Sequence, residues 1–189
     1  NWQNTPMAVW QGKDANNLPI AGTPGSANSP IIYLSGELAS DKILSSGTYV
    51  LGSLLVPAGK KLQINEGVTI VGGLASNIKV LGQVMANGSV EKPIIFTAYK
   101  DSDVGGNFYK QDANWGYIQI LSGGQGEFEN SHFNYGNSKW DNARSKGLLY
   151  LDNSSLILRA VIFDKNLNEK PRGDLPLLNS NNSILVIED

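Results

Sequence analysis

Three aspartates in one polar stretch are the residues best suited to hold a hard cation. Asp101, Asp103 and Asp112 fall in a spacing that also places Gly106 between them. Calcium loops put carboxylates at their first, third and last positions and a glycine at the sharp turn, which is the pattern found here. Gly105 stands where a further oxygen donor is usual, so the stretch also reads as a solvated polar loop. The spacing makes the three aspartates candidate calcium ligands, and no other cofactor is expected.

Aromatic residues gather in and beside two polar stretches, one after Phe96 and one after Phe133. If both stretches leave the scaffold on the same side, their rings would rim a groove in which sugar rings could stack. The candidate ligand-binding residues are Tyr109, Trp140 and Tyr135. The alternative is that these aromatic side chains only anchor their loops. Trp115, beside the first stretch, is expected to pack against the wall of the scaffold.

Catalysis on a polysaccharide would need at least two carboxylates and one basic residue that converge on a common substrate atom. The acids available for it are Asp101, Asp103 and Asp112, or Asp141, Asp152 and Asp164. The single histidine, His132, has no partner that the sequence identifies, so it reads as an outward-facing strand residue. No residue is assigned a catalytic role.

The elements that must position these residues are short β-strands. Between Ser46 and Phe96 the chain repeats a few aliphatic or β-branched residues and then a Gly or Asn corner. The expected glycine corners are Gly52, Gly59, Gly67, Gly72-Gly73, Gly82 and Gly88. The runs are too short and too closely spaced for crossover helices, and few of the corners resemble two-residue hairpin turns. A chain that coils, laying each strand parallel to the one a full turn earlier, satisfies this pattern. The sequence therefore predicts an all-β parallel β-helix.

Alternation within the runs predicts which side chains are buried. The inward residues are expected to be Leu62, Ile64, Val68, Ile70, Ile78 and Val80, each stacked on a like residue one turn away. Asn-Ser pairs at Asn130, Asn153 and Asn182 each precede a strand, and they predict one ladder of stacked amides. The predicted strands of the second half include the single runs 127–133 and 156–163.

The chain divides into two parts by composition. Residues 1–30 are rich in Asn, Gly and Pro, and they read either as an irregular arm or as a cap over the first coil. Residues 31–189 form the predicted β-helix. The final run, 184–189, resembles a strand without a cap, so further domains or self-association at this last turn are possible partners.

Bulk composition excludes several classes of function. With 15 Lys and Arg against 17 Asp and Glu, the chain has no electrostatic footprint for nucleic acid. It contains no cysteine, which removes disulfides and thiol chemistry. No apolar run approaches the length of a membrane-spanning helix. A surface rich in Asn, Ser, Gly and Thr favours an extracytoplasmic location, secreted or anchored at the cell surface.

The stretch 55–70, with Leu55-Val56-Pro57 at its start and Gly67-Val68-Thr69-Ile70 at its end, resembles the opening phrase of bacterial right-handed parallel β-helix proteins. Trp115-Gly116-Tyr117-Ile118 is similar to a later phrase of that group. The resemblance covers about residues 45–121 and points to surface lipoproteins and secreted repeat proteins of Bacteroides-type bacteria. It implies a right-handed β-helix of the pectate-lyase-like kind. Because that fold carries both binding proteins and enzymes, function must be argued from a site.

Two functions are expected from these observations. The first is a non-catalytic surface or secreted module for adhesion, scaffolding or binding of a glycan or cell-surface polymer. The second is a polysaccharide lyase or glycoside hydrolase that uses outward-facing carboxylates.

Overall fold

The computed structural model describes residues 10–13, 19–21, 32–101, 114–136, 147–166 and 177–189. Within these ranges the chain is all β, with no helix, as the sequence predicts. The first strands are β1 (Trp10–Lys13), β2 (Pro19–Ala21), β3 (Ile32–Glu37), β4 (Lys42–Leu44), β5 (Gly47–Val56), β6 (Lys61–Asn65), β7 (Val68–Val80), β8 (Gln83–Asn87) and β9 (Ile94–Ala98). The remaining strands are β10 (Tyr117–Leu121), β11 (Gln125–Glu129), β12 (Ser131–Asn134), β13 (Leu149–Asp152), β14 (Ser155–Arg159), β15 (Ile162–Asp164), β16 (Leu178–Asn181) and β17 (Ile184–Glu188).

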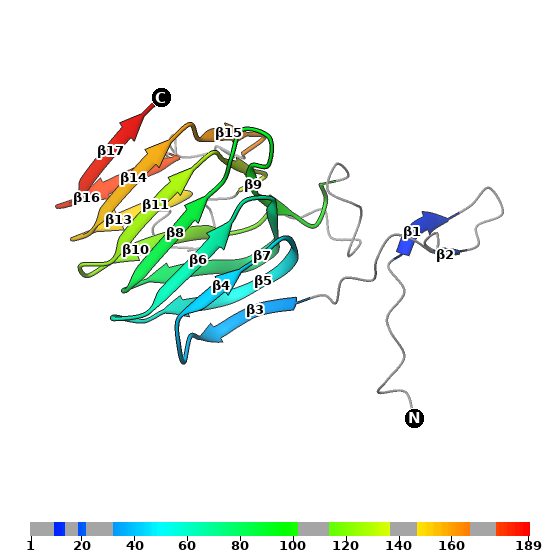
Figure 1. Cartoon of the computed structure of the whole chain (residues 1–189), viewed down its shortest axis with the longest axis horizontal. Coiled ribbons are helices and arrows are strands. Elements are labelled where there is room, and N and C mark those ends of the chain that lie inside the picture. Colours follow the sequence, from blue (N-terminus) through cyan, green and yellow to red (C-terminus); the bar gives the residue numbers. More distant parts are fainter. Residues whose placement is uncertain (1–9, 14–18, 22–31, 102–113, 137–146, 167–176) are drawn as a thin grey trace, which may run out of the picture.

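The strands from β3 onward form two curled sheets in which neighbouring strands run parallel (Figure 1). One sheet has six strands in the order β17-β14-β11-β8-β6-β4. The other has the path β15-β12-β9-β7-β10-β13-β16, with β5 and β3 added on β7. We call a row of hydrogen-bonded parallel strands a ladder. Strands that follow one another in the sequence belong to different ladders, an arrangement compatible with a β-solenoid. We call each passage of the chain through both sheets a rung.

Alternating side chains of these strands meet in one core. In the six-stranded sheet Leu62 is in register with Val84, and in the other sheet Ile78 is in register with Ile118. The inward residues predicted from the sequence are all buried in a single cluster, together with Val56. Burial of each such side chain stabilises the fold by about 1.5–3 kcal/mol, so the repeated pattern is the main source of stability.

A column of aromatic rings runs through this core. Phe96, Phe133 and Phe163 are in register on β9, β12 and β15. The ring centroids of Phe96 and Phe133 lie 4.7 Å apart, and those of Phe133 and Phe163 lie 5.3 Å apart, both nearly parallel. The spacing follows the distance between neighbouring strands, about 4.8 Å.

Several corners between strands are made by residues other than glycine in the left-handed region. Asn130 has a φ of 44° and Ala160 has a φ of 47°, and they separate β11 from β12 and β14 from β15. The runs 127–133 and 156–163, each predicted as one strand, are therefore each two strands. Asn tolerates this conformation better than most residues, whereas Ala has no side-chain compensation for it.

The Asn ladder exists at one corner and is shorter than predicted. Asn153 and Asn182 occupy equivalent places after β13 and β16, and the Asn182 amide donates to Asn153 Oδ1 at 2.5 Å. Asn130 lies at a different corner, where Ala160 is its equivalent, so its assignment to this ladder was wrong. The error comes from the Asn-Ser motif, which serves two different corners of the rung.

Two glycine corners expected from the sequence lie inside long strands. Gly52 falls within β5 and Gly72 within β7. Each long strand spans two ladders, since β7 pairs with β9 through residues 69–72 and with β10 through residues 77–80. A Cβ at Gly72 would lie 2.2 Å from Ser76 Oγ, so the turn of the chain within β7 requires glycine there.

The N-terminal part contributes one described feature. Strands β1 and β2 pair antiparallel with each other as a separate two-stranded sheet. Most of the predicted arm, residues 1–30, lies outside the described residues.

Candidate functional site

Three long connections leave the scaffold from the same corner. They join β9 to β10, β12 to β13 and β15 to β16, and in each case the first strand belongs to the ladder β9-β12-β15 and the second to the ladder β10-β13-β16. We call this place the insertion corner and define it by its described residues Lys100, Asp101, Asn114, Tyr135 and Lys165. The two polar stretches considered in the sequence thus start from one corner of successive rungs, which is the condition for a shared groove.

Tyr135 lies close to two lysines at the insertion corner. The Lys100 and Lys165 ammonium groups each lie 5.3 Å from the centroid of the Tyr135 ring. Lys165 follows β15 as Tyr135 follows β12, and the Tyr135 amide donates to the Asp164 carbonyl at 3.2 Å. Cations at this distance from an aromatic face are attracted by its quadrupole. The arrangement places two positive charges beside a partly buried phenol.

Backbone geometry at this corner is unusual for the residues that occupy it. Tyr135 has a φ of 55° and Lys165 a φ of 53°. A bulky residue in the left-handed region is uncommon and costs of order 1 kcal/mol, and such positions cluster at binding sites. The outlier is therefore a reason to look for function at Tyr135.

Buried polar groups stand at both ends of the first insertion. Asp101 is buried and accepts a hydrogen bond of 2.5 Å from the Thr97 hydroxyl. Asn114 is also buried, and its amide donates to the Gly136 carbonyl at 3.2 Å. Its Oδ1 atom has no hydrogen-bond partner among the described residues. Both ends of the insertion are thus held by the scaffold.

An amide links the second insertion to the third. The Gly136 amide donates to Asn166 Oδ1 at 2.6 Å, and the Asn166 amide donates to the Phe133 carbonyl at 2.7 Å. Asn166 therefore satisfies two backbone groups of the rung below it. No local pattern in the sequence marks Asn166, because its partners lie 30 and 33 residues away.

The predicted site residues fall into three groups. Tyr135 and Asp101 lie at the insertion corner. Tyr109, Trp140, Asp103, Asp112 and Asp141 lie outside the described residues, so the proposed groove and calcium loop stay predictions. Trp115, expected to pack against the scaffold, is 1% exposed, and its ring stacks on Phe96 with centroids 6.2 Å apart.

The other candidate acids and the histidine are spread over the molecule. Asp152 ends β13 and Asp164 ends β15, so they stand at different corners. His132 projects outward on β12 between Ile95 and Ile162. Where the structure describes the chain, no three His, Asp or Glu side chains are grouped as a metal site would require.

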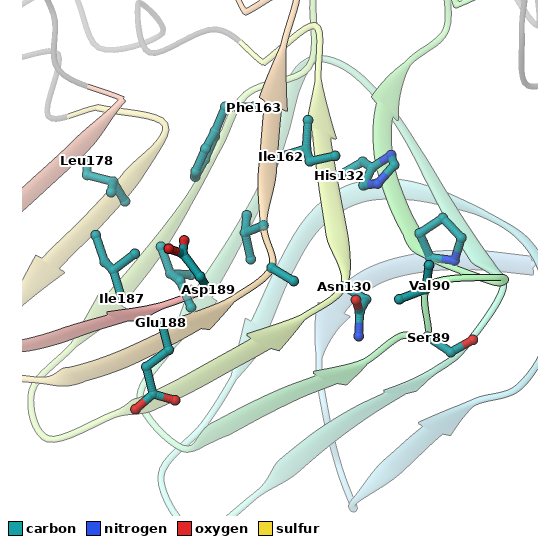
Figure 2. Close-up of a pocket in the computed structure, with 14 residues that line it drawn as sticks. Ser89, Val90, Asn130, His132, Ile162, Phe163, Leu178, Ile187, Glu188 and Asp189 are labelled. Atoms are coloured by element: carbon teal, nitrogen blue, oxygen red, sulfur yellow. The ribbon is translucent and has the colours of Figure 1, made fainter.

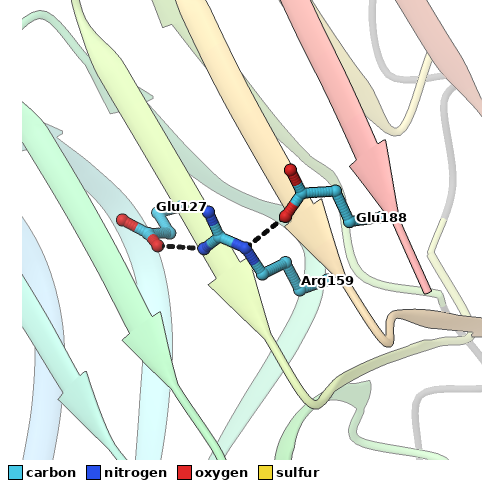
Figure 3. Close-up of polar contacts among 3 residues, drawn as sticks. All are labelled: Glu127, Arg159 and Glu188. Atoms are coloured by element: carbon cyan, nitrogen blue, oxygen red, sulfur yellow. Dashed lines mark hydrogen bonds and ion pairs between the residues drawn. The ribbon is translucent and has the colours of Figure 1, made fainter.

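The outer face of the six-stranded sheet carries one ionic group. Arg159 on β14 bridges Glu127 on β11 and Glu188 on β17, the latter at 2.6 Å (Figure 3). The hydrogen bond to Glu188, followed by the one to Glu127, raises the pKa of the Arg159 guanidinium. Since these side chains are 28–50% exposed, the group ties three rungs together without forming a buried site.

Comparison of this chain with protein-family models, with curated proteins and with solved structures finds no match. In the described residues, no helix has the length and apolar character needed to cross a membrane. The insertion corner is therefore the candidate site of this chain.

Proposed function

We propose that this chain is a non-catalytic, extracytoplasmic module that binds a glycan or another cell-surface polymer at the insertion corner. The observation that supports the proposal most is that three insertions start from one corner of successive rungs, where Tyr135 lies close to two lysines. Binding residues are commonly carried on loops that a rigid scaffold positions. Parallel ladders on either side of the corner supply that rigidity.

The chemistry at the corner suits a polymer of sugars. A tyrosine provides an apolar ring with a polar end, which matches the alternating apolar faces and hydroxyl edges of a pyranose. Lys100 and Lys165 add hydrogen-bond donors near Tyr135. Tyr109 and Trp140 belong to the first and second insertions, and we include them in the proposed groove.

Three further features belong to the same proposal. The parallel solenoid is taken to be a right-handed β-helix of the pectate-lyase-like kind. A calcium ion held by Asp101, Asp103 and Asp112 would order the first insertion. The polar, cysteine-free composition supports secretion or display at the cell surface. The enzyme alternative receives less support, because Asp152 and Asp164 lie at different corners.

A glycan array tests the proposal directly. The chain, Tyr135→Ala and Tyr33→Ala would be applied to the same panel of bacterial and plant polysaccharides. Tyr33 is an exposed tyrosine on β3 at the first rung, so its replacement is a matched control. We expect binding to at least one polymer, weakened about tenfold by Tyr135→Ala, or about 1.4 kcal/mol, and unchanged by Tyr33→Ala. Absence of binding across the panel, or equal loss in both variants, would refute the site.

The calcium part has its own measurement. Calorimetric titration with CaCl2 is expected to show binding that Asp112→Asn weakens. Asp41→Asn is the control, since Asp41 is an exposed acid on the first rungs. A chain that takes up no calcium would leave the glycan proposal standing and remove the metal from it.

A further inference from the structure

The charges at the insertion corner bear on which polymers can bind there. The Lys100 and Lys165 ammonium groups each lie 5.3 Å from the centroid of the Tyr135 ring, so they are at most twice that distance apart. They come from successive insertions, since Lys100 follows β9 and Lys165 follows β15. Two positive charges thus stand beside the ring that is proposed to stack on a sugar.

Carboxylates at this corner neutralise these lysines only in part. The Asp164 carboxylate lies 3.8 Å from the Lys165 ammonium, and both side chains are about half exposed. Asp101 is buried and accepts a hydrogen bond from Thr97. Among the residues that the structure describes, no carboxylate forms an ion pair with Lys100. The exposed charge at the corner is therefore positive.

The second insertion adds positive charge directly after Tyr135. Residues 137–146 lie outside the described residues, but their sequence holds three bases and one acid, Lys139, Arg144, Lys146 and Asp141. Residues 102–113 hold one base and two acids, and residues 167–176 hold two of each. The whole chain has a net charge of -2, so the surplus in the second insertion is local.

The apolar cleft of about 470 Å³ elsewhere on the molecule has the opposite charge. Figure 2 shows Glu188 and Asp189 beside its apolar side chains, and they are the acids that line it. Carboxylates repel an anion, whereas the lysines of the insertion corner attract one.

A charged ligand gains more from these lysines than a neutral one of the same shape. Hydrogen bonds between an ammonium group and an anionic oxygen are roughly twice as strong as those between neutral groups. A neutral sugar would take the same ammonium groups out of water without a compensating charge, which is costly. An anion would also relieve the repulsion between Lys100 and Lys165.

We propose that the polymer bound at the insertion corner is anionic, with carboxylate or sulfate groups that contact Lys100 and Lys165 while a sugar ring stacks on Tyr135. This inference rests on the proposed function and adds to it the charge of the ligand. An ammonium group is a compact point charge with three donors, so it can bind either kind of anionic group.

Matched pairs of polymers separate charge from shape. Dextran sulfate shares its backbone with dextran, and carboxymethyl-cellulose shares its backbone with hydroxyethyl-cellulose. The 189-residue chain would be titrated with all four in a calorimeter, at low salt and at about 1 M NaCl. We expect at least one anionic polymer to bind about tenfold more tightly than its neutral counterpart at low salt. At high salt, where charges are screened within about 3 Å, the two should bind alike.

Lysine variants assign the charge to the corner. Lys100→Met and Lys165→Met keep the aliphatic stems, and each should weaken the anionic polymer about threefold, or about tenfold together. Lys100→Arg keeps the charge and should retain binding. Lys61→Met is the control, because Lys61 lies on β6 in the six-stranded sheet. Binding of the neutral polymers should not change in any of these variants.

The outcomes separate this inference from the function on which it rests. If the polymers that bind, here and in the glycan array, are neutral, the inference falls and the proposed function stands. Equal weakening of charged and neutral polymers by Lys100→Met would also overturn it, since the lysines would then only hold the Tyr135 ring. A loss of the same size with Lys61→Met would mean unspecific attraction and would overturn it too. Absence of binding to every polymer would remove both proposals.

Discussion

Replacement of Phe133 by alanine tests the parallel register on which the insertion corner depends. Phe133 is fully buried, and its ring lies near those of Phe96, Phe163 and Phe128, with the last at 5.3 Å edge-on. Truncation of a buried Phe costs about 3–5 kcal/mol. For a chain of this size that corresponds to a fall in Tm of roughly 6–20 °C.

A double-mutant cycle makes the test specific to the register. Phe96 and Phe133 are on neighbouring strands, so their alanine variants should couple by about 0.5–1.5 kcal/mol. Phe96 and Phe163 lie about two strand spacings apart and share Phe133 as a neighbour, so their variants should couple by less than those of Phe96 and Phe133. Urea unfolding followed by circular dichroism supplies the free energies.

Two outcomes would refute the reasoning. A cost below about 1 kcal/mol for Phe133→Ala would mean that the ring is not enclosed by the rungs around it. Coupling between Phe96 and Phe163 as large as that between Phe96 and Phe133 would mean that the order of the strands is wrong. In either case the insertion corner would lose its geometry.

Three other predictions concern single positions. Ala160→Gly should raise the free energy of unfolding by about 0.5–1 kcal/mol in urea unfolding, because Ala160 is exposed and its φ of 47° is unfavourable for alanine. Asn166→Ala should lower the free energy of unfolding by about 2 kcal/mol, since the Gly136 amide and the Phe133 carbonyl lose their partner. A loss no larger than that caused by Asn179→Ala would contradict these hydrogen bonds. A hydrogen bond with Ser89, then the bond and charge of Lys92, lower the pKa of Glu66, so this contribution to stability is present above the ordinary Glu pKa and lost as pH falls through the lowered one. NMR titration should give a midpoint below the ordinary value that Lys92→Met raises, and an unchanged midpoint in that variant would contradict the assignment.

The interior of the fold was predictable because it depends on a local pattern. Leu62 and Ile64 alternate with Lys61 and Gln63, and this period of two fixes which side chains are buried whatever the partner strand is. Glycine corners were less reliable. Gly59 and Gly67 have positive φ, as expected at turns, whereas Gly72 lies within a strand.

Corners without glycine were not predictable from composition. Ala160 and Lys165 adopt positive φ, although neither residue type favours it. Their conformation is imposed by the neighbouring rungs. Ala160, for example, donates its amide to the Glu188 carbonyl at 3.2 Å. A long-range constraint of this kind leaves no signal in the local sequence, and the same holds for the bonds of Asn166.

The difference between these two kinds of corner bears on function. Most corners that only reverse the chain are made by glycine or asparagine, as at Gly67 and Asn153, because these residues adopt the left-handed region at low cost, with Ser122 and Ala160 as exceptions. At the insertion corner Tyr135 and Lys165 adopt this left-handed conformation, and the Lys165 ammonium lies 5.3 Å from the centroid of the Tyr135 ring. The ladders of the rungs above and below are strong enough to hold this unfavourable conformation. Tyr135→Asn would place a residue that tolerates the left-handed conformation at this corner and would remove the ring. If the corner binds a polymer, this variant should keep the fold and lose polymer binding. If the corner is only structural, binding should be unchanged.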